Sequence, residues 1–356
     1  MASPERFDFA SDNTAAICPP AWAALTEANA EAEVSYGDDK WTRRLVARVR
    51  EIFETDCEVF LIFNGTAANA LALAHLCRSY HAVICHENAH SHTDECGAPE
   101  FFSGGAKLIP LPGRHGKLEL GNIERALLRH GDVHSSKPQV VSVTQATELG
   151  TLYRPQEIEG ICEFARANSL FVHMDGARFA NAIAALDCSP KSITWEAGVD
   201  VLCLGGTKNG TAAGEIVVFF KKELAREFDY RAKQGGQLAS KMRFLAAPWV
   251  GLLDEGAWIE NARHSNRCAK LLARRLSAVL GSEPVFPCEA SAVFLRMSNA
   301  LVSDLEGRGW RFYKFIEPDV YRLMCSWSTT EQQIDEFVAE VTNLWRPARM
   351  AHKYTA

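Results

Sequence analysis

The stretch Asp200-Val-Leu-Cys-Leu-Gly-Gly-Thr-Lys208-Asn-Gly decides the fold prediction. Val201 to Leu204 is a short apolar run that indicates a buried strand, and it leads directly into two glycines, a threonine and Lys208. Burial at the mouth of such a strand favours the neutral form of an amine, which is the nucleophilic form. Lys208 is therefore a candidate Schiff-base lysine, and the alternative is a strand-end lysine that extends into solvent.

A second apolar run, Leu170 to Met174, ends at Asp175. Ligands of open α/β sheets bind at the carboxyl ends of the strands, where Asp175 and Lys208 would meet. A buried carboxylate is costly unless it faces a cation. The protonated pyridine nitrogen of pyridoxal 5′-phosphate is such a cation, and an acidic partner there makes the ring an electron sink.

Composition limits the possible classes of protein. The chain has 356 residues, of which 47% are hydrophobic, so we expect one large domain with a smaller one and a sizeable core. A net charge of −6 gives no basic surface for nucleic acid. We expect no membrane span and no signal peptide. Eleven cysteines without a Cys-x-x-Cys pair indicate reduced thiols in a cytoplasmic protein.

Short apolar runs alternate with amphipathic segments, which predicts an α/β fold with a mostly parallel sheet covered by helices. We predict a large domain over 1–250 and a smaller C-terminal α+β domain over 251–356. The expected strands are 59–63, 83–85, 107–111, 139–144, 170–174, 201–204, 215–220, 292–297, 310–315 and 320–325. The expected helices are 41–54, 67–78, 122–130, 156–168, a tract over 237–280 that breaks near Gly256, and 330–345, whereas 7–20 reads as irregular.

The turn Asn64-Gly65-Thr66 lies between a predicted strand and a predicted helix. Free backbone N–H groups at such a helix start bind anions, Gly65 permits close approach, and the Thr66 hydroxyl can donate to a phosphate oxygen. An ordinary strand-to-helix turn looks the same. Together with Lys208 and Asp175, however, this turn is the expected phosphate site.

Residues 86 to 90 match His-Glu-x-x-His, the signature of zinc proteases. That motif binds zinc only on a helix, where positions four apart share one face. Here His86 follows a predicted strand directly, and no apolar stripe runs through the segment. The competing interpretation is an active-site loop that places the flat imidazole of His90 over a cofactor ring.

Taken together, the motifs resemble those of the low-specificity L-threonine aldolases, in the β-eliminating lyase group of fold-type-I pyridoxal-phosphate enzymes. They span nearly the whole chain in order: Ser11-Asp12-Asn13, Tyr36-Gly37-Asp38-Asp39, Asn64-Gly65-Thr66-Ala-Ala-Asn69, His90 with Glu95-x-Gly97-Ala98, Thr144 to Gly150, Asp175-Gly-Ala-Arg178, Thr207-Lys208, Gly235-Gly236 and Tyr321-Arg322-Leu323. Two segments depart from the family pattern. Gln145-Ala-Thr-Glu-Leu replaces the common Glu-Asn-Thr-His-Asn, and Lys40-Trp41 replaces Pro-Thr.

The resemblance implies a role for each matching residue. Lys208 would bind pyridoxal 5′-phosphate covalently, Asp175 would contact its pyridine nitrogen, and His90 would stack on its ring. The phosphate would be held by Gly65 and Thr66, with Arg231 from a neighbouring subunit, and the cofactor would also be bound by Thr207 and Arg178. The substrate carboxylate would be bound by Ser11, Arg178 and Arg322, with Tyr36 from the partner chain and His134 near the substrate hydroxyl. No protein-bound metal is implied.

The implied reaction is retro-aldol cleavage of an L-3-hydroxy-α-amino acid, such as threonine, to glycine and an aldehyde. The implied assembly is a homotetramer, a dimer of dimers with sites at subunit interfaces. Three alternatives remain: another fold-type-I enzyme (an aminotransferase or β-eliminating lyase), a zinc hydrolase using His86, Glu87 and His90, and a non-catalytic binding protein. The base is left open between His90, His134 and an ordered water. The preferred aldehyde, the configuration at Cβ and any structural cation are also left open.

Overall fold

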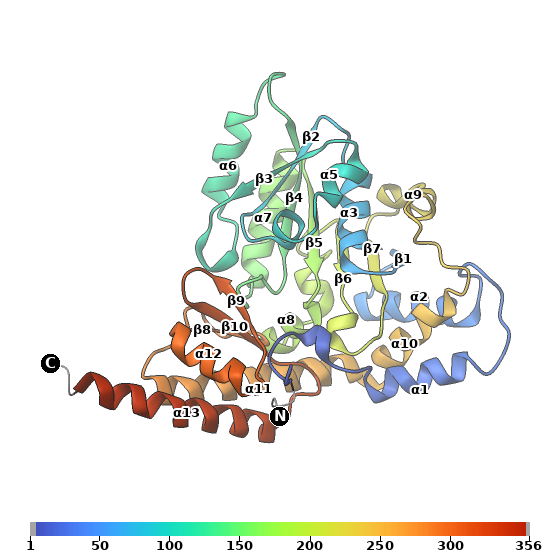
Figure 1. Ribbon diagram of the computed structural model, residues 1–356. Helices are drawn as coiled ribbons and strands as arrows, with labels where there is room; N and C mark the ends of the chain where they lie inside the picture. Colours follow the sequence, from blue (N-terminus) through green and yellow to red (C-terminus); the bar gives the residue numbers. More distant parts are fainter. Residues whose placement is uncertain (1–4, 354–356) are drawn as a thin grey trace.

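The chain forms two β-sheets with helices around them, and this computed structural model describes residues 5–353. The larger sheet has seven strands in the order β1-β7-β6-β5-β4-β2-β3, and the smaller one has three in the order β8-β10-β9. The strands are β1 (Glu58–Ile62), β2 (His81–His86), β3 (Lys107–Leu111), β4 (Lys137–Thr144), β5 (Phe171–Gly176), β6 (Val201–Leu204), β7 (Glu215–Phe219), β8 (Ala292–Arg296), β9 (Tyr313–Ile316) and β10 (Val320–Met324). Figure 1 shows the two sheets as separate parts of one molecule. Both were predicted.

Strand direction brings several loops to one edge of the large sheet. Strands β3, β2, β4, β5 and β6 are parallel neighbours. Strand β7 is antiparallel to both β6 and β1, so β1 again runs in the direction of β6. The carboxyl ends of β1, β4, β5 and β6 and the first residue of β7 therefore lie at the same edge, where a ligand site is expected.

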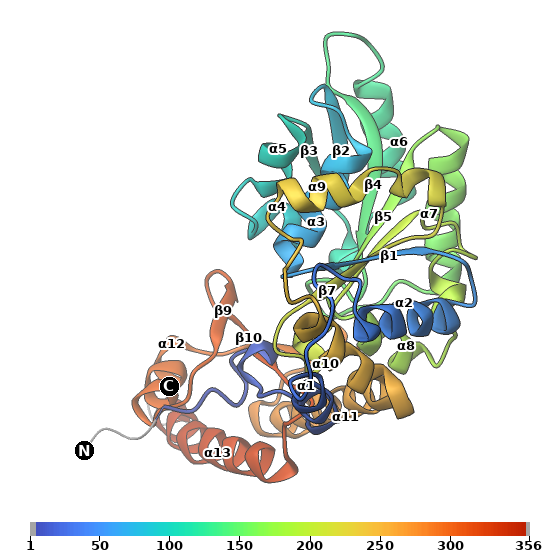
Figure 2. The same cartoon turned by 90° about the vertical axis from the view of Figure 1, so that its right-hand side faces the viewer.

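The large sheet is buried on both faces, and its residues alternate between two cores. In β6, Leu202 and Leu204 pack on one side, whereas Val201 and Cys203 pack on the other. The first side is covered mainly by α1 (Pro19–Ala28), α2 (Lys40–Phe53), α6 (Leu120–Arg129), α7 (Pro155–Ala167), α8 (Phe179–Leu186) and α10 (Arg243–Leu253). The second is covered by α3 (Gly65–Leu76), α5 (Ala98–Ser103) and α9 (Phe228–Gln234), and the short α4 (His90–Thr93) lies beside α3. Figure 2 shows α3 and α9 together on that side.

The smaller sheet packs against α11 (Ala257–Leu280), α12 (Asn299–Gly307) and α13 (Glu331–Lys353). Its core includes one distant residue, Phe9, whose ring stacks on Trp310 and also contacts Phe337. The two cores divide inside α11, because Ala262 belongs to the large core and Cys268 to the small one. The domain boundary at residue 250 stays a prediction.

Most predicted elements are confirmed, with ends that differ by a few residues. The predicted break near Gly256 is the end of α10 and the start of α11. The prediction for 7–20 was wrong at its end, because Pro19 begins α1 as its first residue. Proline is compatible with the first helical turn, where the N–H would have no partner within the helix. Among the described residues, no helix has the length and apolar character needed to cross a bilayer.

Candidate active site

A cavity of ≈ 210 Å³ lies at the carboxyl edge of the large sheet. Six of the predicted site residues line it, namely Gly65, Thr66, His90, Asp175, Thr207 and Lys208. It is also lined by Asn13, Asn64, Ala68, Asn69, Ala177, Cys203, Gly205 and Glu215. The strand ends thus bring together residues that are more than 140 positions apart in the sequence.

Lys208 lies in a short 3-10 turn, Thr207–Asn209, that follows β6. Two close approaches fix the path into this turn. A Cβ on Gly205 would lie 2.5 Å from the carbonyl oxygen of Ala177, and one on Gly206 would lie 2.4 Å from the ring of Trp249. Only glycine fits at both places. The backbone that follows β6 is therefore packed closely against Ala177 and Trp249, and Lys208 lines the cavity.

Glu215 supports the same turn from β7, and the sequence analysis did not identify it. Its Oε2 accepts a hydrogen bond from the Gly206 N–H at 2.6 Å, and its carboxylate also bonds to Thr207. The side chain is buried, and this burial raises the pKa of Glu215 even though the Thr207 and Gly206 hydrogen bonds and Lys208 act against it. Its signal in the sequence is a glutamate at the first position of an otherwise apolar strand.

Asp175 lies next to the last residue of β5, beside Thr144 of β4 and Cys203 of β6. Two hydrogen bonds hold its carboxylate: Oδ1 accepts from the Ala177 N–H at 3.0 Å, and Oδ2 accepts from Asn69 Nδ2 at 2.9 Å. The bond to Asn69 turns the side chain toward α3, so the carboxylate is fixed in position where it lines the cavity.

A chain of hydrogen bonds connects Asp175 to His90 through Asn69 and Glu95. Asn69 Nδ2 donates to Glu95 Oε1 at 2.9 Å, and His90 Nδ1 lies 2.9 Å from the same oxygen. The Glu95 side chain is fully buried, and burial raises its pKa. The hydrogen bond to Glu95 in turn raises the pKa of His90, although burial acts against it. The imidazole is thereby oriented through Nδ1, and this bond does not use Nε2, the other ring nitrogen of a side chain that lines the cavity.

The predicted phosphate site is the amino end of α3. Asn64 caps the helix by accepting a hydrogen bond from the Ala67 N–H at 2.9 Å, so the helix begins at Gly65. Gly65 has open space where a Cβ would be, which permits close approach of a ligand to the backbone. The N–H groups of Gly65 and Thr66 precede the first bonded turn and suit an anion.

Two predicted site residues, Arg178 and Arg322, are not among the described residues that line the cavity, but they lie close enough to interact electrostatically with each other. Arg178 is buried at the start of α8, where Nε and Nη2 donate to Asp12 Oδ2 and Oδ1 at 2.6 and 3.0 Å. Arg322 comes from β10 of the smaller domain, and burial together with the nearby Arg178 lowers its pKa. Ser11 precedes Asp12 and caps that short turn, accepting from the Asn13 N–H at 3.2 Å. Asp12 lies in the Ser11-Asp12-Asn13 motif, but the sequence alone gave no indication of this ion pair.

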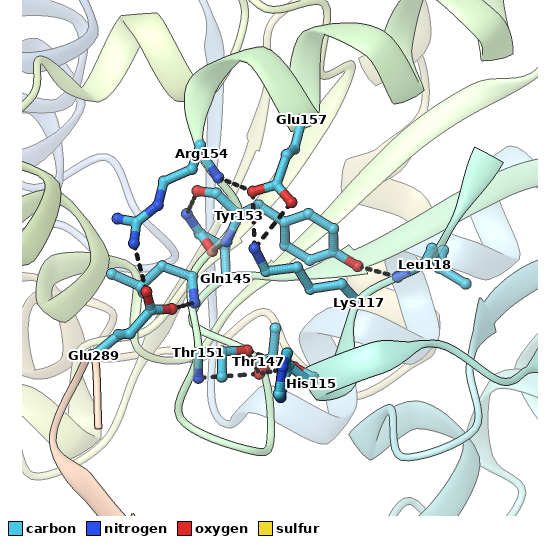
Figure 3. Close-up of polar contacts among 11 residues, drawn as sticks. His115, Lys117, Leu118, Gln145, Thr147, Thr151, Tyr153, Arg154, Glu157 and Glu289 are labelled. Atoms are coloured by element: carbon cyan, nitrogen blue, oxygen red, sulfur yellow. Dashed lines mark hydrogen bonds and ion pairs between the residues drawn. The ribbon is translucent and has the colours of Figure 1, made fainter. Parts of the chain in front are cut away.

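The segment from Thr144 to Gly150 is anchored by its own polar contacts (Figure 3). Gln145 and Tyr153 exchange two hydrogen bonds, at 2.9 and 3.0 Å, and the Tyr153 hydroxyl accepts from the Leu118 N–H at 2.6 Å. Gln145 therefore holds this loop in place, and it stands in the segment where this sequence departs from the family pattern. Glu148, in the same loop, interacts electrostatically with His90, Arg178 and Arg322.

Tyr36 and Arg231 also lie outside the cavity of their own chain. Tyr36 is 53% exposed, with the ammonium of Lys233 over its ring. Arg231 lies on α9 beside His75 and Tyr230, and its Nη1 donates to the Phe102 carbonyl at 3.3 Å. Their predicted role was toward a neighbouring subunit's site, and it stays a prediction.

The structure does not bring His134 to the cavity. It is exposed in the loop before β4, where its N–H donates to Asp132 Oδ1 at 2.9 Å. The cavity lies at the other end of β4, and an eight-residue strand spans roughly 25 Å. The prediction that His134 contacts a substrate hydroxyl is therefore wrong for the site of its own chain.

The His-Glu-x-x-His segment does not form a helix. His86 is the last residue of β2, whereas His90 begins α4. Both ring nitrogens of His86 are occupied, because Nδ1 accepts from the Asn88 N–H and Nε2 bonds to the Gly113 carbonyl oxygen, each at 3.0 Å. The zinc interpretation requires His86 and His90 on one face of one helix, and the structure does not place them there. His90 instead follows the loop after β2 and lines the cavity, as the competing interpretation expected.

The residues around the cavity fit pyridoxal 5′-phosphate. A lysine that can hold the cofactor covalently (Lys208), a fixed carboxylate for the pyridine nitrogen (Asp175) and a helix start for the phosphate (Gly65 and Thr66) surround one space. His90 adds a flat ring at the same cavity. Four chemically different requirements are thus met by residues from separate elements.

The chain is similar to known proteins over nearly its whole length. Residues 8–299 match the family described as Beta-eliminating lyase. A "Low specificity L-threonine aldolase" of Pseudomonas sp. is 55% identical over 94% of this chain and 96% of its own, and one of Pseudomonas aeruginosa is 56% identical with the same coverage. A solved structure titled as threonine aldolase of Leishmania major superposes with a TM-score of 0.90 at 28% identity, covering 95% of this chain and 99% of that one. This chain belongs to the beta-eliminating lyase family.

Proposed function

We propose that this protein is a pyridoxal-phosphate-dependent aldolase that cleaves L-threonine, L-allo-threonine and related L-3-hydroxy-α-amino acids, such as phenylserine, to glycine and an aldehyde. The observation that carries the proposal is that Lys208 and Asp175, from neighbouring strand ends, line one cavity. Relatives that cover almost the whole chain at 55% and 56% identity are named low-specificity L-threonine aldolases, which supports the choice of reaction.

The cofactor, when bound, supplies an electron-withdrawing ring that takes up the electron pair of the breaking Cα–Cβ bond. The task of the protein is to fix the substrate so that this bond breaks rather than another one. Arg178, Arg322 and Ser11 gather near the cavity and are proposed to hold the α-carboxylate. The fixed negative charge of Asp175 favours a protonated ring nitrogen in the cavity.

We assign the general base to His90, acting directly or through a water. Its Nδ1 is held by the buried Glu95, so Nε2 can accept the proton of the substrate β-hydroxyl. An imidazole suits this task near neutral pH, and general-base assistance typically contributes about 10²–10⁴-fold in rate. His134 is not proposed for this role, because it lies beyond the far end of β4.

The proposed assembly is a homotetramer made of two dimers, with each site completed by the partner chain. Tyr36 and Arg231 support this proposal, since neither reaches the cavity of its own chain, and Arg231 Nε is a buried donor without a hydrogen-bond partner within the described residues. The proposed location is the cytoplasm, which agrees with cysteines that are all free in the structure.

The proposed function is tested with the purified protein, pyridoxal 5′-phosphate and L-threonine. Glycine and acetaldehyde should form in equal amounts without a keto-acid acceptor, and borohydride reduction should attach the cofactor to Lys208 by peptide mass mapping. A Lys107→Ala variant, which alters an exposed lysine at the start of β3, serves as the matched control for Lys208→Ala. Turnover that depends on a keto acid, or a reduced adduct on another lysine, would overturn the assignment.

A further inference from the structure

Asp12 has no role in the chemistry described above, yet it is among the most deeply placed charges of the site. Its side chain is 3% exposed, and both of its oxygens accept hydrogen bonds from Arg178. Burial would raise the pKa of Asp12, but the charges of Arg178, Lys208 and Arg322 outweigh that effect and the pKa is lowered. Asp12 is therefore a carboxylate held ionised in a buried place.

The ion pair between Asp12 and Arg178 makes the two arginines differ in their hydrogen bonding. Arg178 has its Nε–Nη2 edge occupied by Asp12, so that edge is closed to a substrate. Arg322 has a buried Nε with no hydrogen-bond partner among the described residues. Two neighbouring guanidinium groups repel each other, and Asp12 supplies the closest negative charge, with Glu148 contributing from the loop after β4. A buried cationic donor without a partner is energetically unfavourable, and an incoming carboxylate would supply the missing partner.

The polypeptide that carries Asp12 is attached to the smaller domain. Phe9 is part of the smaller core, and its carbonyl accepts from the Met324 N–H at 3.0 Å. Arg6 forms an ion pair with Glu336 at 2.7 Å, and Trp327 Nε1 donates to the Ala16 carbonyl at 3.0 Å. The segment 6–16 thus lies on the smaller domain, while its turn at Asp12 reaches across to Arg178 at the start of α8.

We propose that Asp12 is a positioning residue for binding of the substrate α-carboxylate: it locks the orientation of Arg178 and offsets its charge, so that Arg322 stays beside it as the donor for the carboxylate. This inference rests on the proposed function and assigns a separate task within it. It predicts that Asp12 matters only for ligands that carry a carboxylate, and that binding of the cofactor does not depend on it.

The test measures binding of two amines to the holoenzyme through the visible spectrum of its cofactor. Glycine carries the carboxylate, and ethanolamine has a hydroxymethyl group in its place. The Asp12→Asn variant should weaken glycine binding at least about tenfold, which corresponds to about 1.4 kcal/mol, and should change ethanolamine binding by less than about twofold. Asp8→Asn is the matched control, because Asp8 is in the same segment but pairs with Arg6 and Gln333 away from the cavity. It should behave like the wild type.

Two further variants keep the test decisive if Asp12→Asn does not fold. Arg178→Lys keeps the positive charge but cannot form the pair of parallel hydrogen bonds to Asp12. It should therefore weaken glycine binding and leave ethanolamine binding unchanged. Asp12→Glu keeps the carboxylate and should recover part of the lost glycine affinity. Equal losses for glycine and ethanolamine, or unchanged glycine binding in both Asp12→Asn and Arg178→Lys, would overturn the inference. A wild-type protein that binds no cofactor would instead refute the proposed function.

Discussion

Replacing Glu95 by glutamine should move the acid limb of the pH profile to lower pH. His90 must be neutral to accept a proton from the substrate, so activity is lost as the pH falls through the pKa of His90. The hydrogen bond to Glu95 raises that pKa, with smaller contributions from Asp175 and Glu148 and with burial acting against it. A glutamine can accept the same hydrogen bond at 2.9 Å but brings no negative charge. The imidazolium form is then less favoured.

The size of the effect follows from the kind of bond that is lost. A hydrogen bond to a charged group contributes about 1.5–3 kcal/mol to stability, and a neutral one contributes about 0.5–1.5 kcal/mol. The difference, about 1–1.5 kcal/mol, corresponds to about one pH unit. Because the Glu95 side chain is fully buried, solvent does not screen this interaction away.

The assay is kcat/KM for L-threonine cleavage between about pH 5 and 9, since this ratio reports the ionisation of the free enzyme and free substrate. The substrate is the same for both proteins, so a difference between their acid limbs belongs to the enzyme. Glu87→Gln is the matched control, because Glu87 is exposed in the same loop region. An acid limb that stays in place in Glu95→Gln would refute the assignment of His90 as the base.

Three other predictions follow from the site. Asp175→Asn should weaken cofactor retention about 10- to 150-fold, the equivalent of a charge-assisted hydrogen bond, and a cofactor titration that matches the wild type would contradict this. His134→Asn should leave kcat within about twofold of the wild type, because an exposed loop residue far from the site has little effect; a tenfold loss at saturating cofactor would reinstate His134. Gly206→Ala should lower the free energy of unfolding by about 1–3 kcal/mol in urea titrations, since its Cβ would lie 2.4 Å from the Trp249 ring; an unchanged midpoint would show that the indole can move aside.

The large sheet was predictable because its central strands are buried on both faces and its strands are mostly short apolar runs. Val201–Leu204 and Lys107–Leu111 were predicted with the bounds that the structure has. The start of α1 was missed because a Pro-Pro pair suggests a stop, whereas proline at the first helical position suits a start.

The cavity was predictable to the extent that strand ends determine it. Lys208 and Asp175 each follow an apolar run, and parallel strands bring such ends together. The supporting polar residues were not predictable in this way. Asn69 and Asp12 act through contacts made by folding, over 106 and 166 positions of sequence, and no local pattern reports such a pairing.

His134 shows the opposite case. The sequence placed it before the strand that ends at Thr144, and the strand itself then carries it to the far edge of the sheet. A match to a family position does not fix which end of a strand a loop occupies, whereas strand direction does. Glu215 was missed although its position could have been noticed, since a glutamate that opens a buried strand needs polar partners at the sheet edge.

The attachment of segment 6–16 to the smaller domain has a consequence for the order in which the protein is completed during synthesis. The chain emerges from its amino end, so Phe9 and Asp12 are made first, but the smaller-domain surface that holds their segment is made last. Phe9 packs on Trp310 and Phe337, about 300 positions later in the chain.

The large sheet can therefore assemble around Lys208 and Asp175 while the first residues still lack their binding surface. The arginine beside Asp12 obtains its partner only after the carboxyl-terminal helix has left the ribosome. A chain that is cut short in its last 50 or so residues would keep the cofactor-binding strands yet lose the placement of its own amino-terminal segment.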